Sequence, residues 1–229
     1  MKAHHRGQVF LVSSPASEPQ PNYSAHFELF SNLLTTCGYD KNYSEPESLP
    51  KTAGQDLIFL DASTSDRPMD VYRNHDGVGR WIMFNLEPGA IDESDAIIEG
   101  MEGAFYHNDS PELILKGLRR LEKMDVWFKR MSINEALRRM RDTGKFRRKA
   151  IANGTANSQN HSVNPNLTKR EVTIIELVSK GCQNQEIADQ LHISVNTVKT
   201  HIYSIFRKTQ SRNRIELLAW TQAYFHDIA

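Results

Sequence analysis

The chain has 229 residues, of which 39% are hydrophobic and 24% are charged, and its formal net charge at pH 7 is zero. These values are typical of a soluble globular protein with two domains, and they argue against disordered and fibrous classes. No apolar run in the sequence approaches the roughly 20 residues that cross a bilayer, and the stretch 9–12 is too short for a signal peptide. We therefore expect a cytoplasmic protein without a membrane partner.

The zero net charge conceals an uneven distribution of charged residues. Residues 1–118 contain 8 basic and 18 acidic residues, whereas residues 119–151 contain 12 basic and 4 acidic ones. Residues 152–229, with 8 basic and 6 acidic residues, are mildly basic. Polyanionic partners are therefore expected at the middle and C-terminal parts of the chain.

The first 118 residues alternate between short apolar runs, bounded by polar or turn-forming residues, and segments with helical periodicity. Such alternation predicts parallel βαβ units and therefore an α/β fold with a doubly wound parallel sheet. Gly38 is expected to end the first helix, and Pro111 is expected to begin a later one. The expected strands are 9–12, 57–60, 81–84 and 104–106, and the expected helices are 26–37 and 111–124.

A further basic, amphipathic helix is expected from Asp125 to Asp142, the sixth of the regulatory domain. Its apolar stripe comprises Val126, Ile133, Leu137 and Met140. Residues 150–166 have no apolar periodicity and are rich in Asn, Ser and Gly, which is typical of a flexible linker. The expected organisation is a regulatory domain at 1–149, the linker at 150–166 and a C-terminal domain at 167–229.

The C-terminal domain has the caps and spacing of several short helices. Thr168, followed three residues later by Glu171, forms a capping box and predicts a helix start. Asn184 is expected to cap a second helix, and Ser194 caps a third one after a tight turn at 192–194. This arrangement predicts an all-α helix-turn-helix domain, which ends in a last helix over 214–225.

The helix after Ser194 has two opposite faces. One is an apolar stripe at helical spacing, formed by Val198, Ile202, Ile205 and Phe206. The opposite face is polar and cationic, and it consists of Asn196, Lys199, Thr200, Tyr203 and Arg207. Side chains of this kind suit the base edges and phosphates of a DNA major groove.

The run EIADQLHISVNTVKTHIYSIFRK, with its Glu-Ile-Ala and Thr-Val-Lys-Thr-His signatures, closely resembles the DNA-binding domain of LuxR/NarL-type regulators. The resemblance extends from Leu167 to about Ala223. It implies a double-stranded promoter DNA partner, with RNA polymerase as a further partner. The residues that it places toward the bases are Lys199, Thr200 and Tyr203, and those toward the phosphates are Thr197, His201 and Lys208. It also implies that the last helix takes part in dimerisation on DNA.

An acidic α/β domain that precedes such a DNA-binding domain resembles a response-regulator receiver. By this resemblance, Asp61 after strand 57–60 takes the position of the phosphorylated aspartate. Ser13 and Ser14 replace the acidic pair of that family. Asn85 stands at the fourth-strand position, and His107 or a neighbour stands where the lysine is found. Phosphoryl transfer needs a metal and a cation to offset charge, so we expect a structural carboxylate here and no metal site.

The chain also resembles the biofilm matrix regulators of the CsgD and VpsT type, through Gly103-Ala104-Phe105-Tyr106, the long extra helix and the head. In VpsT-like members a motif Trp-[Phe/Leu/Met]-[Thr/Ser]-Arg binds cyclic di-GMP, and this chain has Trp127-Phe128-Lys129-Arg130. Trp127 and Arg130 are three positions apart on the expected helix and therefore share one face, so the indole and the guanidinium can both stack on guanine. The alternative is that Trp127 is a buried anchor and that the basic residues form a solvated face.

We therefore expect a DNA-binding transcription regulator that is controlled by cyclic di-GMP and homodimerisation and acts on biofilm matrix or motility genes. The expected dimer interface comprises Ile133, Leu137 and Met140. Two alternatives are a phosphorelay response regulator phosphorylated at Asp61 and a ligand-independent regulator controlled by a protein partner. The sequence shows no nucleophile–base constellation and no metal-ligand spacing, so we expect no enzymatic activity and no cofactor.

Overall fold

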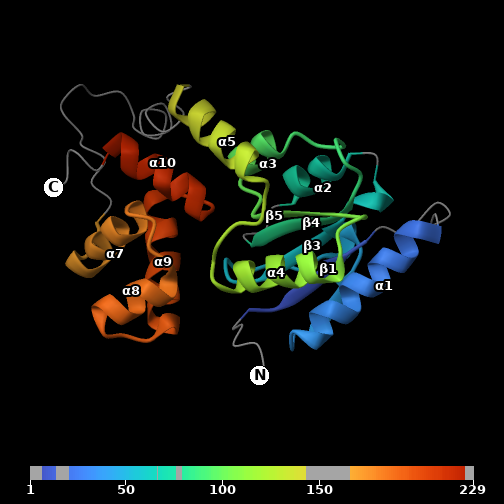
Figure 1. Ribbon diagram of the computed structural model, residues 1–229, viewed down its shortest axis with the longest axis horizontal. Coiled ribbons are helices and arrows are strands. Elements are labelled where there is room, and N and C mark those ends of the chain that lie inside the picture. Colours follow the sequence, from blue (N-terminus) through green and yellow to red (C-terminus); the bar gives the residue numbers. More distant parts are fainter. Residues whose placement is uncertain (1–6, 14–20, 66, 76–78, 143–165, 225–229) are drawn as a thin grey trace. The chain divides into compact units, whose positions relative to one another are not determined.

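A computed structural model describes residues 7–13, 21–65, 67–75, 79–142 and 166–224 (Figure 1). The chain forms two compact units, Met1–Phe128 and Lys129–Ala229. Ser14 and almost all of the expected linker, 150–166, lie outside the described residues. The described helices include none with the length and apolar character needed to cross a membrane.

The first unit is built on a parallel, five-stranded sheet with the order β2-β1-β3-β4-β5. Its strands are β1 (Val9–Val12), β2 (Lys41–Ser44), β3 (Leu57–Asp61), β4 (Arg80–Leu86) and β5 (Gly103–Tyr106). This order belongs to doubly wound folds, in which the chain reverses its direction of winding between β1 and β3. The expected α/β class, with a receiver-like sheet, is confirmed.

Two layers of helices cover the sheet. Helices α1 (Pro21–Thr36) and α4 (Pro111–Glu122) pack on one face, where Phe30 stacks on Phe84 with ring centroids 4.5 Å apart. Helices α2 (Pro68–Asn74) and α3 (Glu93–Glu99) supply apolar side chains such as Met69 and Ala96 to the other face. Short 3-10 turns at Pro46–Ser48 and Ala62–Thr64 complete the unit. Asp61, at the end of β3, therefore lies at the carboxyl edge of a sheet buried on both faces.

The extra helix is shorter than the sequence predicts. Helix α5 runs from Arg130 to Asp142, whereas the prediction began it at Asp125. The backbone of Trp127 instead pairs with β5: its N–H donates to the carbonyl of Glu102, and its carbonyl accepts from the N–H of Ala104. The predicted helical stripe is wrong at its first member, because Val126 precedes the helix and is buried in the first unit.

The second unit is all-α, as expected. It contains α5 and the helices α7 (Lys169–Ser179), α8 (Asn184–Leu191), α9 (Val195–Thr209) and α10 (Arg214–Tyr224). Helix α10 packs against α7, α9 and α5. The unit boundary after Phe128 therefore differs from the expected domain end at 149, because α5 buries Ala136 and Met140 in the second unit.

Candidate nucleic-acid interface and regulatory sites

Local caps define the starts of α7, α8 and α9, the first three helices of the reading head, by which we mean the DNA-binding part of the second unit at residues 167–224. The capping box of Thr168 and Glu171 is confirmed, since each side chain bonds the backbone N–H of the other residue. Ser194 caps α9 as predicted, by accepting from the N–H of Thr197 at 3.0 Å. The cap of α8 is Gln183 rather than Asn184. Asn184 is instead the first residue of α8. Its side chain does not cap the helix, because it is buried, at 1% exposure, and accepts a hydrogen bond from Arg214.

Helix α9 separates its side chains into a buried face and an open one. Its apolar residues Val198, Ile202, Ile205 and Phe206 are all buried in the second unit. The predicted base-facing stripe is half-buried or exposed in the unit: Asn196, Lys199, Thr200, Tyr203 and Arg207. Because these positions recur at helical spacing, they lie along one side of α9. This side of α9 thus lies outside the apolar core of the unit, as a helix that enters a groove requires.

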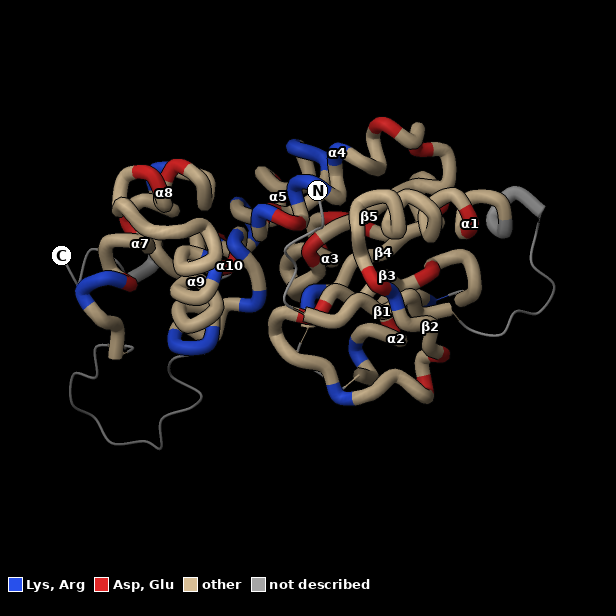
Figure 2. Tube along the Cα trace, turned by 90° about the horizontal axis from the view of Figure 1, so that it is seen from below, with Lys and Arg blue, Asp and Glu red and all other residues tan. Residues whose placement is uncertain are grey.

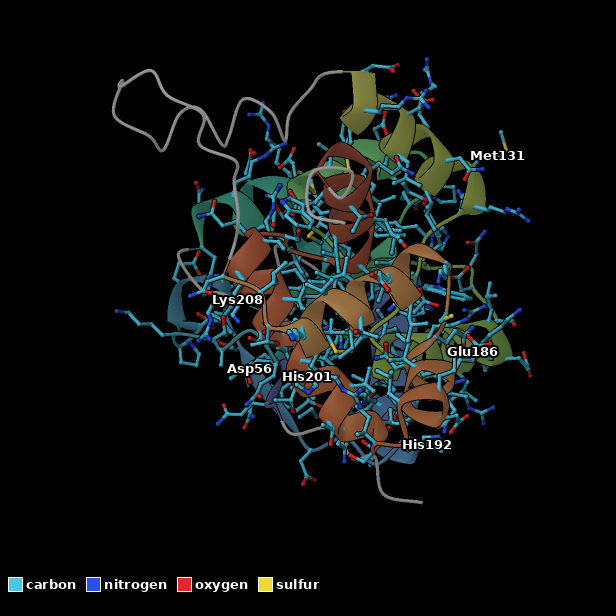
Figure 3. All side chains as sticks on the ribbon, turned by 90° about the vertical axis from the view of Figure 1, so that its left-hand side faces the viewer. Asp56, Met131, Glu186, His192, His201 and Lys208 are labelled. Carbon is cyan, nitrogen blue, oxygen red and sulfur yellow. The ribbon has the colours of Figure 1, made fainter. Side chains whose placement is uncertain are left out.

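The residues expected to face phosphates lie on the flank between these two faces. Thr197, His201 and Lys208 share this flank with Ser204, and Figure 3 labels two of them along α9. Thr197 is exposed and its hydroxyl lies 2.8 Å from that of Ser194. His201 is half-buried. Thr197 and His201 therefore stay candidates for phosphate contact.

Lys208 forms a tertiary ion pair within the unit, and its expected contact with phosphate stays a prediction. Its Nζ donates to the carboxylate of Glu171 at 2.7 Å, and the hydroxyl of Ser204 donates to the other oxygen at 2.7 Å. Glu171 is 3% exposed. Burial acts to raise the pKa of Glu171, but the hydrogen bonds from Lys208, Ser204 and Thr168 outweigh it and leave the pKa at about 2. Lys208 thus ties α9 to the start of α7, a tertiary contact that helical spacing does not reveal.

The start of α10 is fastened to the loop before α8. Asn213 is fully buried, and its side chain caps α10 by accepting from the N–H of Glu216 at 2.8 Å. Arg214 donates to the carbonyl of Cys182 and to the side chain of Asn184. These contacts fix the helix-turn-helix against α10, so α9 is presented from a rigid support.

Asp61 is buried among neutral hydrogen-bond donors. Its Oδ1 accepts from the N–H and hydroxyl of Ser63 at 3.0 and 2.7 Å and from the amide of Asn85 at 3.1 Å. Its Oδ2 accepts from the hydroxyl of Ser13 at 3.3 Å. Asp61 is 3% exposed and caps the 3-10 turn that follows β3. These contacts fix the carboxylate at the end of β3, and the expectation of a structural rather than a phosphorylated Asp61 stays a prediction. His107, near the expected lysine position, lies 3.2 Å from the carbonyl of Leu86.

Trp127 anchors the edge of the sheet and is not on a helix. Its indole stacks on Phe105 with centroids 6.1 Å apart, and Phe128 packs into the core on the opposite face. A Cβ at Gly117 would lie 2.8 Å from the indole and 2.4 Å from the ring of Phe105, so only glycine fits there. The expectation that Trp127 and Arg130 share one helix face is therefore wrong, because α5 begins only at Arg130.

The remaining motif residues and the expected dimer stripe lie in the second unit. Lys129 and Arg130 are exposed, and basic residues continue along α5 (Figure 2). Ile133 and Leu137 are half-buried. Met140 is 2% exposed, so the fold of the unit already covers this part of the expected dimer interface. Met131, which the sequence did not single out, is 83% exposed (Figure 3).

A receiver-like α/β unit and a helix-turn-helix unit together define a DNA-binding transcription regulator. The family of bacterial regulatory proteins called luxR matches residues 165–221. Residues 165–221 therefore match a LuxR-family DNA-binding domain, and this domain follows a receiver-like unit in the chain.

Two curated relatives and one solved structure illustrate the similarity. The nitrate/nitrite response regulator protein NarL of Escherichia coli K12 is 26% identical over 191 residues, 82% of each chain. The CsgBAC operon transcriptional regulatory protein of the same organism is 30% identical over 120 residues, 52% of this chain and 49% of that protein. The regulatory domain of the master biofilm regulator CsgD has a TM-score of 0.45 and 13% identity, covering 57% of this chain and 98% of the domain.

Proposed function

We propose that the chain reads promoter DNA with the open side of α9, where Lys199, Thr200 and Tyr203 face the bases. The observation that carries this proposal is the division of α9 into a buried apolar face and an open polar one. The ammonium of Lys199 can donate to guanine acceptors, while the Tyr203 hydroxyl can donate or accept. Thr197 and His201, on the adjoining flank, suit phosphate oxygens.

Single substitutions on this stripe test the groove face. Lys199→Ala and Tyr203→Ala should each weaken specific promoter binding by about 1–3 kcal/mol and leave the melting temperature unchanged. Lys180→Ala is a matched control, because Lys180 is an exposed cation at the end of α7 and away from the stripe. If gel-shift affinity falls no further in the stripe variants than in the control, α9 is not the reading helix.

Cyclic di-GMP is the proposed signal, with residues Trp127–Arg130 as its site. The exposed cations Lys129 and Arg130 suit a ligand with two phosphates, and Arg can also stack on guanine. Trp127 contributes by fixing the backbone just before this pair, through its pairing with β5. The proposal is supported by the motif and by the exposure of its two cations.

Calorimetric titration of the full chain with cyclic di-GMP tests the site. Arg130→Ala and Lys129→Ala should each reduce the affinity at least about tenfold, since each removes a charge-assisted contact. Arg138→Ala, which removes another exposed cation of α5, should bind as the unchanged chain does. Absence of heat at saturating ligand, or equal loss in the control, would refute the proposal.

Ligand-dependent dimerisation is proposed to connect this site to DNA. Ile133 and Leu137 of α5 keep part of their apolar surface open. Two linked heads bind two half-sites together with a higher effective concentration and no new base contact. Leu137→Arg should keep the chain monomeric in sedimentation with cyclic di-GMP, and an unchanged mass of the wild-type chain at saturation would contradict the mechanism. Biofilm matrix or motility genes are the proposed targets, and RNA polymerase is the proposed partner at the promoter.

Phosphorylation at Asp61 is the second candidate. It is favoured by the position of Asp61 at the carboxyl end of β3 and by the similarity to a response regulator over 82% of the chain. Stoichiometric labelling by acetyl phosphate that Asp61→Asn abolishes would establish this candidate. We expect no labelling, because neutral donors rather than cations surround the carboxylate in the described structure.

A further inference from the structure

A chain of buried hydrogen bonds runs from Asp61 through Asn85 to α1. The Nδ2 of Asn85 donates to Asp61 at 3.1 Å, and its Oδ1 lies 2.5 Å from the Nδ1 of His26. His26 is 5% exposed, Asn85 is 1% exposed and Asp61 is 3% exposed. Three elements of the first unit, α1, β3 and β4, thus meet at these side chains at the carboxyl edge of the sheet.

The direction of each hydrogen bond follows from Asp61. An ionised carboxylate only accepts, so the amide nitrogen of Asn85 must face Asp61, and the amide oxygen must face His26. This oxygen also only accepts, so the Nδ1 of His26 must carry a proton. In neutral His26 the other ring nitrogen, Nε2, is then a bare acceptor. This nitrogen is buried and has no hydrogen-bond partner within the described part of the chain.

Asn85 adopts a backbone conformation that a strand residue rarely has. Its φ is +60°, in the left-handed region, and the pairing of β4 with β5 shifts register between Met83 and Leu86. An asparagine tolerates this conformation better than most residues, but it is held there by the surrounding contacts. The hydrogen bonds to Asp61 and His26 therefore help to hold a strained point of the sheet.

We propose that the Nε2 of His26 is a proton-binding site through which acidification loosens the contact between α1 and the carboxyl edge of the sheet. A proton on this nitrogen creates an N–H donor and a positive charge in a buried place without an acceptor. Protonation does not break the hydrogen bond between Nδ1 and Asn85, so the whole free-energy cost comes from the buried charge at Nε2 of His26. Relief requires His26 to move toward water, which withdraws support from Asn85.

The surroundings of His26 have opposite effects on its pKa. Burial lowers the pKa of His26, whereas the hydrogen bond that His26 donates to Asn85 and the carboxylates of Asp109 and Asp61 raise it, and His107 lowers it. Burial prevails, so the folded chain binds this proton less readily than the unfolded chain does. Stability of the first unit must therefore fall as the pH drops through the ordinary range of histidine, about 6.5, toward the lower value of the folded state.

Titration of the full chain by NMR tests this site directly. The ring signals of His26 should titrate below the ordinary midpoint of a histidine, about 6.5. Asn85→Gly is the matched variant, since glycine accepts the positive φ and removes only the side chain. It should move the titration of His26 further down, because a bond that raises the pKa is lost. An ordinary midpoint for His26, or no change in Asn85→Gly, would overturn the proposal.

Thermal melting against pH gives a second, independent readout. Between about pH 7 and about pH 5 the melting temperature of the first unit should fall in the wild-type chain and fall less in His26→Gln. His192→Gln should retain the wild-type slope. If His26→Gln does not fold, the NMR titrations of the wild-type chain and Asn85→Gly still decide. Equal slopes in folded His26→Gln and wild type would overturn the proposal.

Discussion

Asp61 in the receiver-like unit and Glu171 in the DNA-binding unit are both 3% exposed, yet their partners differ in charge. Asp61 is satisfied by serine hydroxyls, a backbone N–H and an amide, whereas Glu171 is paired with the ammonium of Lys208. A buried carboxylate held by neutral donors tolerates loss of its charge, but one held by a cation does not. The first unit therefore depends less on the charge of Asp61 than the second unit does on the charge of Glu171.

The units also differ in overall charge. Residues 1–128 contain 11 basic and 20 acidic residues, and residues 129–229 contain 17 basic and 8 acidic ones. The structural boundary thus separates formal charges of −9 and +9, close to the −10 and +10 on either side of residue 118. Because α5 lies in the second unit, its arginines add to the positive potential that attracts DNA.

The largest effect is expected where the first unit does contain a buried ion pair. Arg80 and Glu102 are paired with side chains 4% and 5% exposed. Glu102→Ala should destabilise the first unit by about 3–5 kcal/mol, because an uncompensated guanidinium is left in the core. Calorimetric melting of the full chain measures this, and Arg73→Ala, which breaks an exposed pair, should be nearly neutral. Similar losses in both variants would contradict the importance of burial.

Glu171→Gln tests the second unit. The pKa of about 2 implies that the ionised form contributes on the order of 3 kcal/mol relative to an ordinary carboxyl. This contribution is complete above the unfolded pKa, about 4.3, and is lost as the pH falls through about 2. Acid titration of unfolding should show the loss in the wild-type chain and a flatter profile in Glu171→Gln. A flat wild-type profile would count against the contact with Lys208.

Gly117→Ala tests the anchor of Trp127. The added methyl meets Phe105 and the indole at distances that real Cβ atoms do not reach, so about 1–3 kcal/mol of stability should be lost. Adding Trp127→Leu should restore part of the loss by removing one of the two clashes. If the single variant is as stable as the wild-type chain, the indole does not pack against α4 as described.

The smallest effect is expected at Asp61. Asp61→Asn preserves an oxygen that can accept from Ser63 and Asn85, so the stability should change by less than about 1 kcal/mol. Promoter activity should also stay close to wild type in Asp61→Ala and Asp61→Glu. Loss of activity with Ala together with a gain with Glu would instead support the phosphorelay candidate.

Helical spacing made the reading head predictable from the sequence. The apolar and polar stripes of α9 repeat with the period of the helix, and the caps at Thr168 and Ser194 are local signals. The role of Lys208 was not predictable, because its partner Glu171 is 37 positions away in the chain. In α10 the fully buried Leu217 and the nearly buried Trp220 were also missed, since α5 covers a second side of that helix.

The receiver-like unit was predictable in class but not in detail. Strand β2 contains Lys41 and Asn42 and no apolar run, because an edge strand is only partly covered. Helices α2 and α3 have seven residues each, too few for a clear period. The misplacement of Trp127 has another cause: apolar residues at 126–128 fit a helix and a strand equally well. The pairing with β5 decides between them.

The short pairing of Trp127 with β5 also protects the protein from self-association. β5 ends the sheet, and an uncovered end strand offers its backbone N–H and carbonyl groups to any extended chain. Here the backbone of Trp127 occupies part of that row, while the other end strand, β2, is polar and contains a lysine. A change that releases residues 125–128 would thus expose the edge of β5 to pairing with other chains. Solubility would then fall, even where the fold of both units survives.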